Sequence, residues 1–132
     1  MGNRFCRADS LGPLVYDYLA MEALPQGVEL VDGGLAGLNL LSLFEGCRRI
    51  VVVDRVDGFG RPGEVLKLGW DDYAQGSYVE YGHSSALHYL LLCLPSLGIV
   101  PATEVLLVGA EDSGQPSVIA KAAEIVLEAV NE

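Results

Sequence analysis

The chain has 132 residues, of which 51% are hydrophobic, and a formal net charge of −10. A chain of this length and apolar content fits a single domain over residues 1–132 that can bury a core of its own. The acidic balance argues against nucleic acid and anionic membrane surfaces, since both select basic patches. We therefore expect one domain whose better partner is an electropositive protein surface.

The cysteines and the apolar runs point to the cytoplasm. Cys6, Cys47 and Cys93 are odd in number and form no Cys-x-x-Cys pair, so neither a disulfide framework nor a zinc knuckle is indicated. No basic region leads into an apolar segment at the start, and no apolar run approaches the roughly 20 residues that cross a bilayer. Reduced thiols and no membrane insertion are the prediction.

The first half of the chain alternates helix and strand signals. Apolar residues at helical spacing predict a helix over 11–24, which ends before Pro25. A short strand is predicted over 28–31, followed by a helix over 37–44. The β-branched run within 49–53 is typical of a buried strand.

The second half continues this alternation. Glycines and prolines predict a loop over 55–63, and alternating polar and apolar residues predict a strand over 64–68. Residues 70–82 are predicted to form a loop that can hold a short helix. The remaining predicted elements are a helix over 84–97, a strand over 104–108 and a helix over 117–130. The pattern predicts an α/β fold, a three-layer sandwich with a mainly parallel sheet and helices on both faces.

Three potential metal ligands stand in distinct contexts. Asp9 precedes the first helix, Asp54 ends a buried strand, where α/β sheets bind ligands, and His83 lies in a loop before a helix. Two carboxylates and one imidazole can hold a nickel, zinc or iron ion and leave coordination positions open. Each also has a plainer interpretation: Asp9 as a helix cap, Asp54 as a loop brace, and His83 as a bystander.

A glycine-rich segment follows the second predicted element. Asp32 is followed by Gly33, Gly34 and Gly37, whose lack of side chains lets the backbone bend freely and lets a substrate chain approach closely. A plain strand-to-helix turn would use the same residues. The segment has neither the Lys of a Walker sequence nor the glycine spacing of a dinucleotide site.

These motifs follow one another in a familiar order: Gly2-Asn3, Asp9 with Gly12, Asp32-Gly33-Gly34 with Gly37, Asp54, and His83. In that order they resemble the hydrogenase maturation proteases, endopeptidases that trim the C-terminal tail of the nickel-iron hydrogenase large subunit. The resemblance covers nearly the whole chain, including the strand at 105–109 and the last helix.

The resemblance implies a peptidase with a hydrogenase large-subunit precursor as its partner. It implies that Asp9, Asp54 and His83 are catalytic residues that contact nickel, and that the segment of Asp32 and its glycines binds substrate. The nickel is supplied by the substrate, and another divalent metal can occupy the site in isolation. Such an ion can polarise the scissile carbonyl or activate water, and Asp9 or Asp54 can accept the proton. Cys6 could also approach the metal, although a small buried residue explains it equally well.

The sequence departs from the family pattern at three places. Ala8 stands where many relatives have a further acidic residue, and Leu35 stands where Thr usually follows Asp-Gly-Gly. The family has a complete apolar strand before the position of Gly2-Asn3. Loss of a central strand would leave its neighbours with unpaired backbone groups, so we expect several more apolar residues upstream of Met1.

Two alternatives stay open at this point. A signalling receiver domain would use Asp54 as a phosphoacceptor, but no Lys follows the strand at 104–108 and no acidic pair follows a first strand. A noncatalytic nickel-binding or scaffold relative would keep the fold and bind metal without cleavage.

Overall fold

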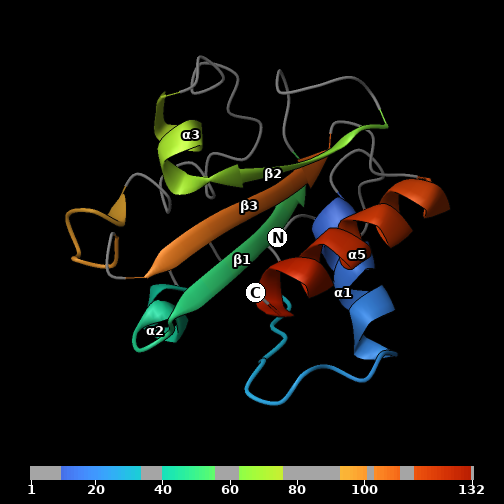
Figure 1. Ribbon diagram of the computed structural model, residues 1–132, viewed down its shortest axis with the longest axis horizontal. Helices are drawn as coiled ribbons and strands as arrows, with labels where there is room; N and C mark the ends of the chain where they lie inside the picture. The colour runs from blue at the N-terminus through green and yellow to red at the C-terminus, as the bar shows by residue number, and fades with distance from the viewer. Residues whose placement is uncertain are drawn as a thin grey trace.

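The described part of the chain contains both helices and strands, although they do not alternate strictly. The computed structural model describes residues 10–33, 40–55, 63–75, 93–100, 103–110 and 115–131. Its helices are α1 (Leu11–Ala20), α2 (Leu41–Phe44), α3 (Trp70–Gln75) and α5 (Pro116–Asn131), and its strands are β1 (Arg49–Arg55), β2 (Val65–Gly69) and β3 (Glu104–Ala110). Figure 1 shows them as a twisted sheet with helices packed beside it. This is the predicted α/β fold class.

The described sheet is small and mixed. Its order is β1-β3-β2, with β1 parallel to β3 and β2 antiparallel to β3. The prediction of a mainly parallel sheet is therefore wrong for β2. The segment 56–64 between β1 and β2 is shorter than the dozen or so residues that a parallel crossover requires, so the chain turns back at the same edge.

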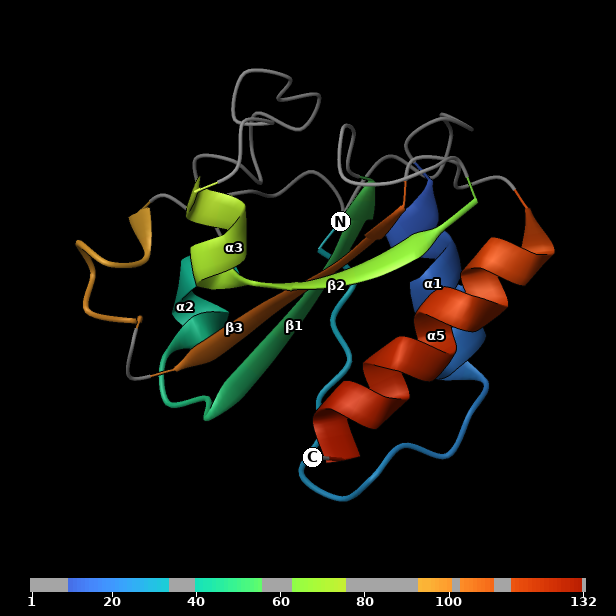
Figure 2. The same cartoon turned by 45° about the horizontal axis from the view of Figure 1, so that its top comes forward.

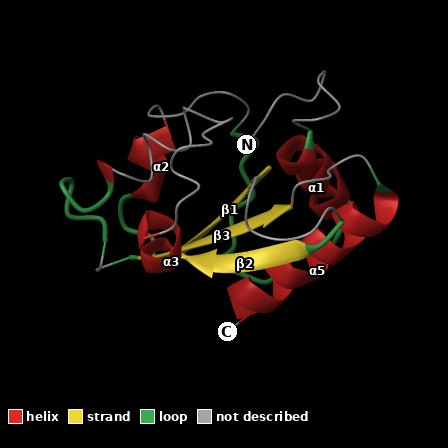
Figure 3. Cartoon of the chain, turned by 90° about the horizontal axis from the view of Figure 1, so that it is seen from above, coloured by secondary structure: helices red, strands yellow, loops and turns green. Residues whose placement is uncertain are grey.

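Apolar clusters lie against both faces of the sheet. Val52 and Leu107 pack with Phe44 of α2, whereas Val108 packs with Leu11 of α1 and Ala122 of α5. Figure 3 shows α1 and α5 on one side of the strands and α2 and α3 on the other. Both faces of β1 and β3 are thus apolar, which agrees with the uninterrupted hydrophobic runs in their sequences.

The observed bounds of α1 and α5 can be compared with the predicted ones. α1 begins at Leu11 as predicted, and the Leu14 amide donates to the carbonyl of Ser10 at 3.0 Å. It ends at Ala20, four residues before the predicted end. The Glu22 amide donates to the Leu19 carbonyl at 3.0 Å, in a turn that closes the helix. α5 matches its predicted bounds to one residue at each end.

Two other predictions are only partly tested. Only Leu41–Phe44 of the helix predicted over 37–44 is described, and Gly46, with a φ of +80°, follows its end. Most of the predicted 55–63 loop and of the predicted 84–97 helix lies outside the described residues. In the part that is described, no helix is long and apolar enough to span a membrane.

The strand predicted over 28–31 is wrong. These residues are irregular, and they pair with none of the described strands. An apolar run of this kind becomes a strand only when a neighbouring strand accepts its backbone hydrogen bonds. A groove lies between this segment and β1 instead, and its lining includes Val28, Leu30, Ile50 and Val51.

Candidate active site

Asp54 is a fully buried carboxylate near the end of β1. Its side chain has 0% exposure, and its Oδ1 accepts a hydrogen bond from the Arg55 backbone N–H at 2.8 Å. Side chains alternate along a strand, so Asp54 shares a face with the core residue Val52. Burying a carboxylate costs free energy, so such a position marks a candidate functional group.

The carboxyl ends of β1 and β3 meet at one edge of the sheet. Asp54 pairs with Gly109, and Arg55 pairs with Ala110. Gly109 has no side chain, so β3 places only backbone at the position paired with Asp54. The parallel pairing therefore places the buried Asp54 carboxylate beside the backbone of Gly109, at the edge where α/β sheets bind ligands.

The first helix begins at this same edge. Leu11, at the start of α1, belongs to the same buried cluster as Val108 and Ala110 at the end of β3. Figures 1 and 2 show α1 starting near the pointed end of β1 and running back along the sheet. The first helix thus begins beside the strand ends, while Asp9, which precedes it in the sequence, lies outside the described residues.

Of the predicted metal contacts, only Asp54 is described. Asp9 and His83 lie outside the described residues, and within those residues no three His, Cys, Asp or Glu side chains could hold a metal ion together. The trio therefore stays a prediction. Cys47 and Cys93 are free thiols, and Cys6 lies outside the described residues.

The predicted substrate-binding segment is half described. Asp32 is exposed and Gly33 is partly buried, while Gly34 and Gly37 lie outside the described residues. Gly33 lines the groove that runs beside β1. The structure thus places the start of this segment next to β1.

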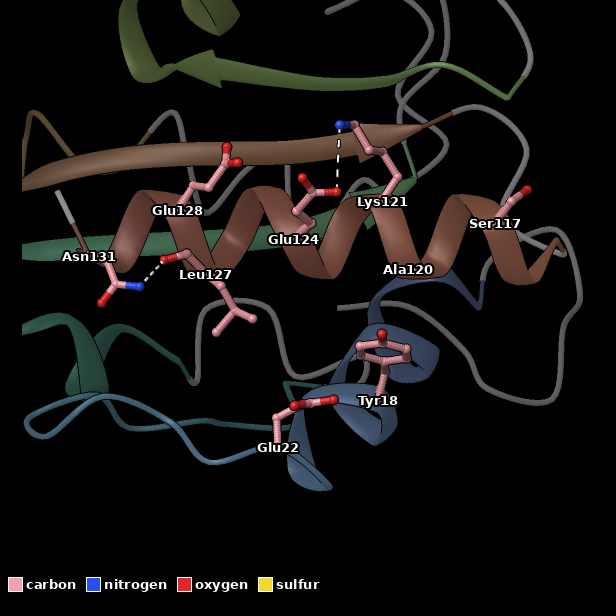
Figure 4. A pocket seen from close by; sticks show the side chains of 9 residues that line it. All are labelled: Tyr18, Glu22, Ser117, Ala120, Lys121, Glu124, Leu127, Glu128 and Asn131. Carbon is pink, nitrogen blue, oxygen red and sulfur yellow. Dashed lines mark hydrogen bonds and ion pairs between the residues drawn. The ribbon is translucent and has the colours of Figure 1, made fainter.

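A second hollow lies between the outer surfaces of α1 and α5, and it contains none of the predicted site residues. Figure 4 shows acidic side chains around it, including Glu22, Glu124 and Glu128. Lys121 Nζ lies 3.7 Å from Glu124, and both side chains are more than half exposed. This hollow is a solvated helical face.

Sequence reasoning missed Gly109 as the partner of Asp54. The signal was present in two apolar runs of similar length, 50–53 and 105–108, one followed by Asp and the other by Gly. Parallel pairing of these runs in register brings the two residues together.

Comparisons with known proteins agree with this architecture. The family model described as hydrogenase maturation protease matches residues 13–132. The hydrogenase expression/formation protein HupD of Rhodobacter capsulatus is 30% identical over 83% of this chain, which spans 57% of the length of HupD. The solved hydrogenase maturating endopeptidase HybD from E. coli is 26% identical, with a TM-score of 0.75, over 98% of this chain and 88% of that one. An endopeptidase from Escherichia coli, solved in solution, is 26% identical, with a TM-score of 0.78, over 99% and 88%.

The chain belongs to the hydrogenase maturation protease family, a family of peptidases. This assignment replaces the receiver-domain alternative. The resemblance stated from the sequence motifs is thereby confirmed.

Proposed function

We propose that this protein is an endopeptidase that removes the C-terminal tail of a nickel-loaded hydrogenase large-subunit precursor. The observation that carries the proposal is the fully buried Asp54 at the carboxyl end of β1, within a chain of this peptidase family. The names of the relatives support it, since HybD is a hydrogenase maturating endopeptidase. The free thiols Cys47 and Cys93 favour action in the cytoplasm.

Asp54 has the properties that a metal-contacting carboxylate needs. Oδ1 is oriented by the Arg55 amide, and the neighbouring strand offers only Gly109 at the paired position. A preoriented carboxylate in an apolar setting interacts with a cation more strongly than one in water. We assign Asp9 and His83 as the other contacts, from their positions in the family motifs.

Nickel belongs to the substrate in this scheme. The precursor presents its metal to Asp9, Asp54 and His83, and a precursor without nickel lacks that anchor. The segment of Asp32, Gly33, Gly34 and Gly37 binds the tail of the precursor. The ion can polarise the scissile carbonyl, and a carboxylate that does not contact it accepts a proton from the attacking water.

The intact mass of a precursor tests this proposal. A large-subunit precursor from the same source is incubated with the protein, once loaded with nickel and once nickel-free, after circular dichroism has shown the protein to be folded. We expect loss of a short C-terminal peptide from the loaded precursor only. Cleavage of both forms would refute nickel gating. Binding of the loaded form without cleavage would favour the noncatalytic relative.

A further inference from the structure

The hollow between α1 and α5 follows one face of α5 along the whole helix. It has a volume of about 1100 Å³. Its lining on α5 recurs every three or four residues and includes Ser117, Ala120, Glu124, Leu127 and Asn131. This spacing defines a single stripe of the helix, about 21 Å long at a rise of 1.5 Å per residue. The opposite stripe of α5 is buried, so the hollow occupies the outer face of the helix.

Apolar side chains lie in the space between the two helices. Figure 4 shows the ring of Tyr18 pointing from α1 toward α5, and the side chain of Leu127 pointing from α5 toward α1. The Tyr18 side chain is 41% exposed, although it is large and mostly apolar. Aromatic residues of this kind are common anchors at protein interfaces, because they bury much area with few rotatable bonds.

Carboxylates from both helices flank this apolar strip. Glu22 extends from α1, and Glu124 and Glu128 extend from α5, whereas Lys121 supplies one ammonium group, 3.7 Å from Glu124. Glu22 and Glu128 form no ion pair with any other described residue. Such a surface repels nucleic acid, anionic membrane and a second copy of this acidic chain. It attracts a partner that is both apolar and basic.

The shape of the hollow indicates the secondary structure of that partner. Two neighbouring helices leave between them a groove into which the side-chain ridge of a third helix packs. Glu124 and Glu128 are one turn apart, so they match Lys or Arg side chains four residues apart on an incoming helix. An amphipathic helix of about 14 residues would span the stripe on α5 and place its apolar face on Tyr18.

One end of the hollow lies near the edge of the sheet that holds Asp54. Ser117, in the first turn of α5, lines this end. Figures 1 and 2 show α1 and α5 both starting on the side of the sheet where β1 and β3 end. A precursor seated with its metal at Asp54 is therefore next to this end of the hollow.

We infer that the hollow between α1 and α5 is a docking site for a basic amphipathic helix of the large-subunit precursor, separate from the site that cleaves its tail. The inference rests on the proposed function for the identity of the partner. Contacts made in the hollow are the same before and during cleavage, so they raise the affinity for the precursor without changing the rate of bond breakage.

Binding of nickel-free precursor tests the charged part of the docking site. This form lacks the metal anchor and is not processed in the proposed scheme, so biolayer interferometry at low ionic strength reports its affinity alone. Glu124→Gln with Glu128→Gln should weaken binding by about fivefold or more and flatten its salt dependence. Glu45→Gln with Asp71→Asn removes the same charge from exposed positions outside the hollow, and should keep the affinity within about twofold. Equal weakening by both pairs, or no binding by the unchanged protein, would overturn the inference.

Two variants of Tyr18 test the apolar part. Tyr18→Ser removes the ring and should weaken binding of the same precursor by about tenfold, whereas Tyr18→Phe keeps the ring and should bind normally. Circular dichroism confirms that both variants are folded. Unchanged binding by Tyr18→Ser would overturn the inference, because a contact made by charge alone does not need the hollow.

Cleavage of nickel-loaded precursor, followed by intact mass, separates this inference from the peptidase proposal. The Glu124 and Glu128 pair of substitutions should raise KM by about fivefold and leave kcat within about twofold. Binding that depends on the hollow, without cleavage by any version, would support the docking site and refute the peptidase proposal. Cleavage with an unchanged KM in this pair would overturn the docking site and leave the peptidase proposal intact.

Discussion

The two edges of β1 have different neighbours, although the same seven residues form both edges. On one edge, all residues from Arg49 to Arg55 pair with β3, and Asp54 is held against Gly109. On the other edge, the same strand borders a groove and the irregular segment 27–31. Local sequence thus determines that β1 is a strand, whereas its pairing depends on residues that are distant in the sequence.

Matched leucine truncations should expose this difference most strongly. Leu107 of β3 is 2% exposed and pairs with Val52, whereas Leu43 is 45% exposed in the wall of the groove. Leu107→Ala should lower the free energy of unfolding by about 2–5 kcal/mol, because it leaves a cavity. Leu43→Ala should lower it by less than about 1 kcal/mol. Urea unfolding of both variants measures this, and equal losses would mean that the groove side is as tightly packed as the paired side.

Arg49 ties the paired edge to the last helix. Its Nη1 donates to the Ala129 carbonyl at 2.7 Å, and its Nε donates to Glu104 at 3.0 Å. Arg49→Met keeps most of the aliphatic stem but removes these bonds, so we expect a loss of about 1–2 kcal/mol in urea unfolding. Faster amide exchange near the end of α5 should accompany it. An unchanged α5 would show that apolar packing alone holds that end.

The smallest effect is expected at the acidic helical face. Lys121 and Glu124 are both more than half exposed, and their charged atoms are 3.7 Å apart. Lys121→Ala should change the free energy of unfolding by less than about 0.5 kcal/mol, because water screens exposed ion pairs. A loss as large as that of Arg49→Met would give this face a structural role that its exposure does not suggest.

The sequence correctly predicts those helices and strands whose own residues show a clear hydrophobic pattern. β1, β3 and α5 follow from β-branched runs and helical spacing, and Asp54 at a strand end follows from its place after Val53. The prediction of a strand at 28–31 is wrong because a strand also needs a neighbouring strand for its backbone hydrogen bonds, and the local sequence does not specify that neighbour. β2 runs antiparallel to β3 because the segment before it is short. The spacing of apolar residues within β2 does not reveal this direction.

The candidate site divides in the same way. Burial of Asp54 follows from the apolar run that precedes it, whereas the predicted approach of Asp9 and His83 to Asp54 depends on segments distant in sequence. Family motifs predict that trio, and no local physical pattern does. Asp54 therefore provides the sharpest test.

The decisive measurement is the intact mass of nickel-loaded precursor after incubation with the Asp54→Asn variant. Asn keeps the shape of the side chain but removes its charge, so we expect the rate of tail removal to fall by about a hundredfold or more, with an unchanged circular dichroism spectrum. Asp71→Asn, at an exposed position of α3, should process the precursor normally. Normal processing by folded Asp54→Asn would contradict the assignment of this carboxylate to the active site.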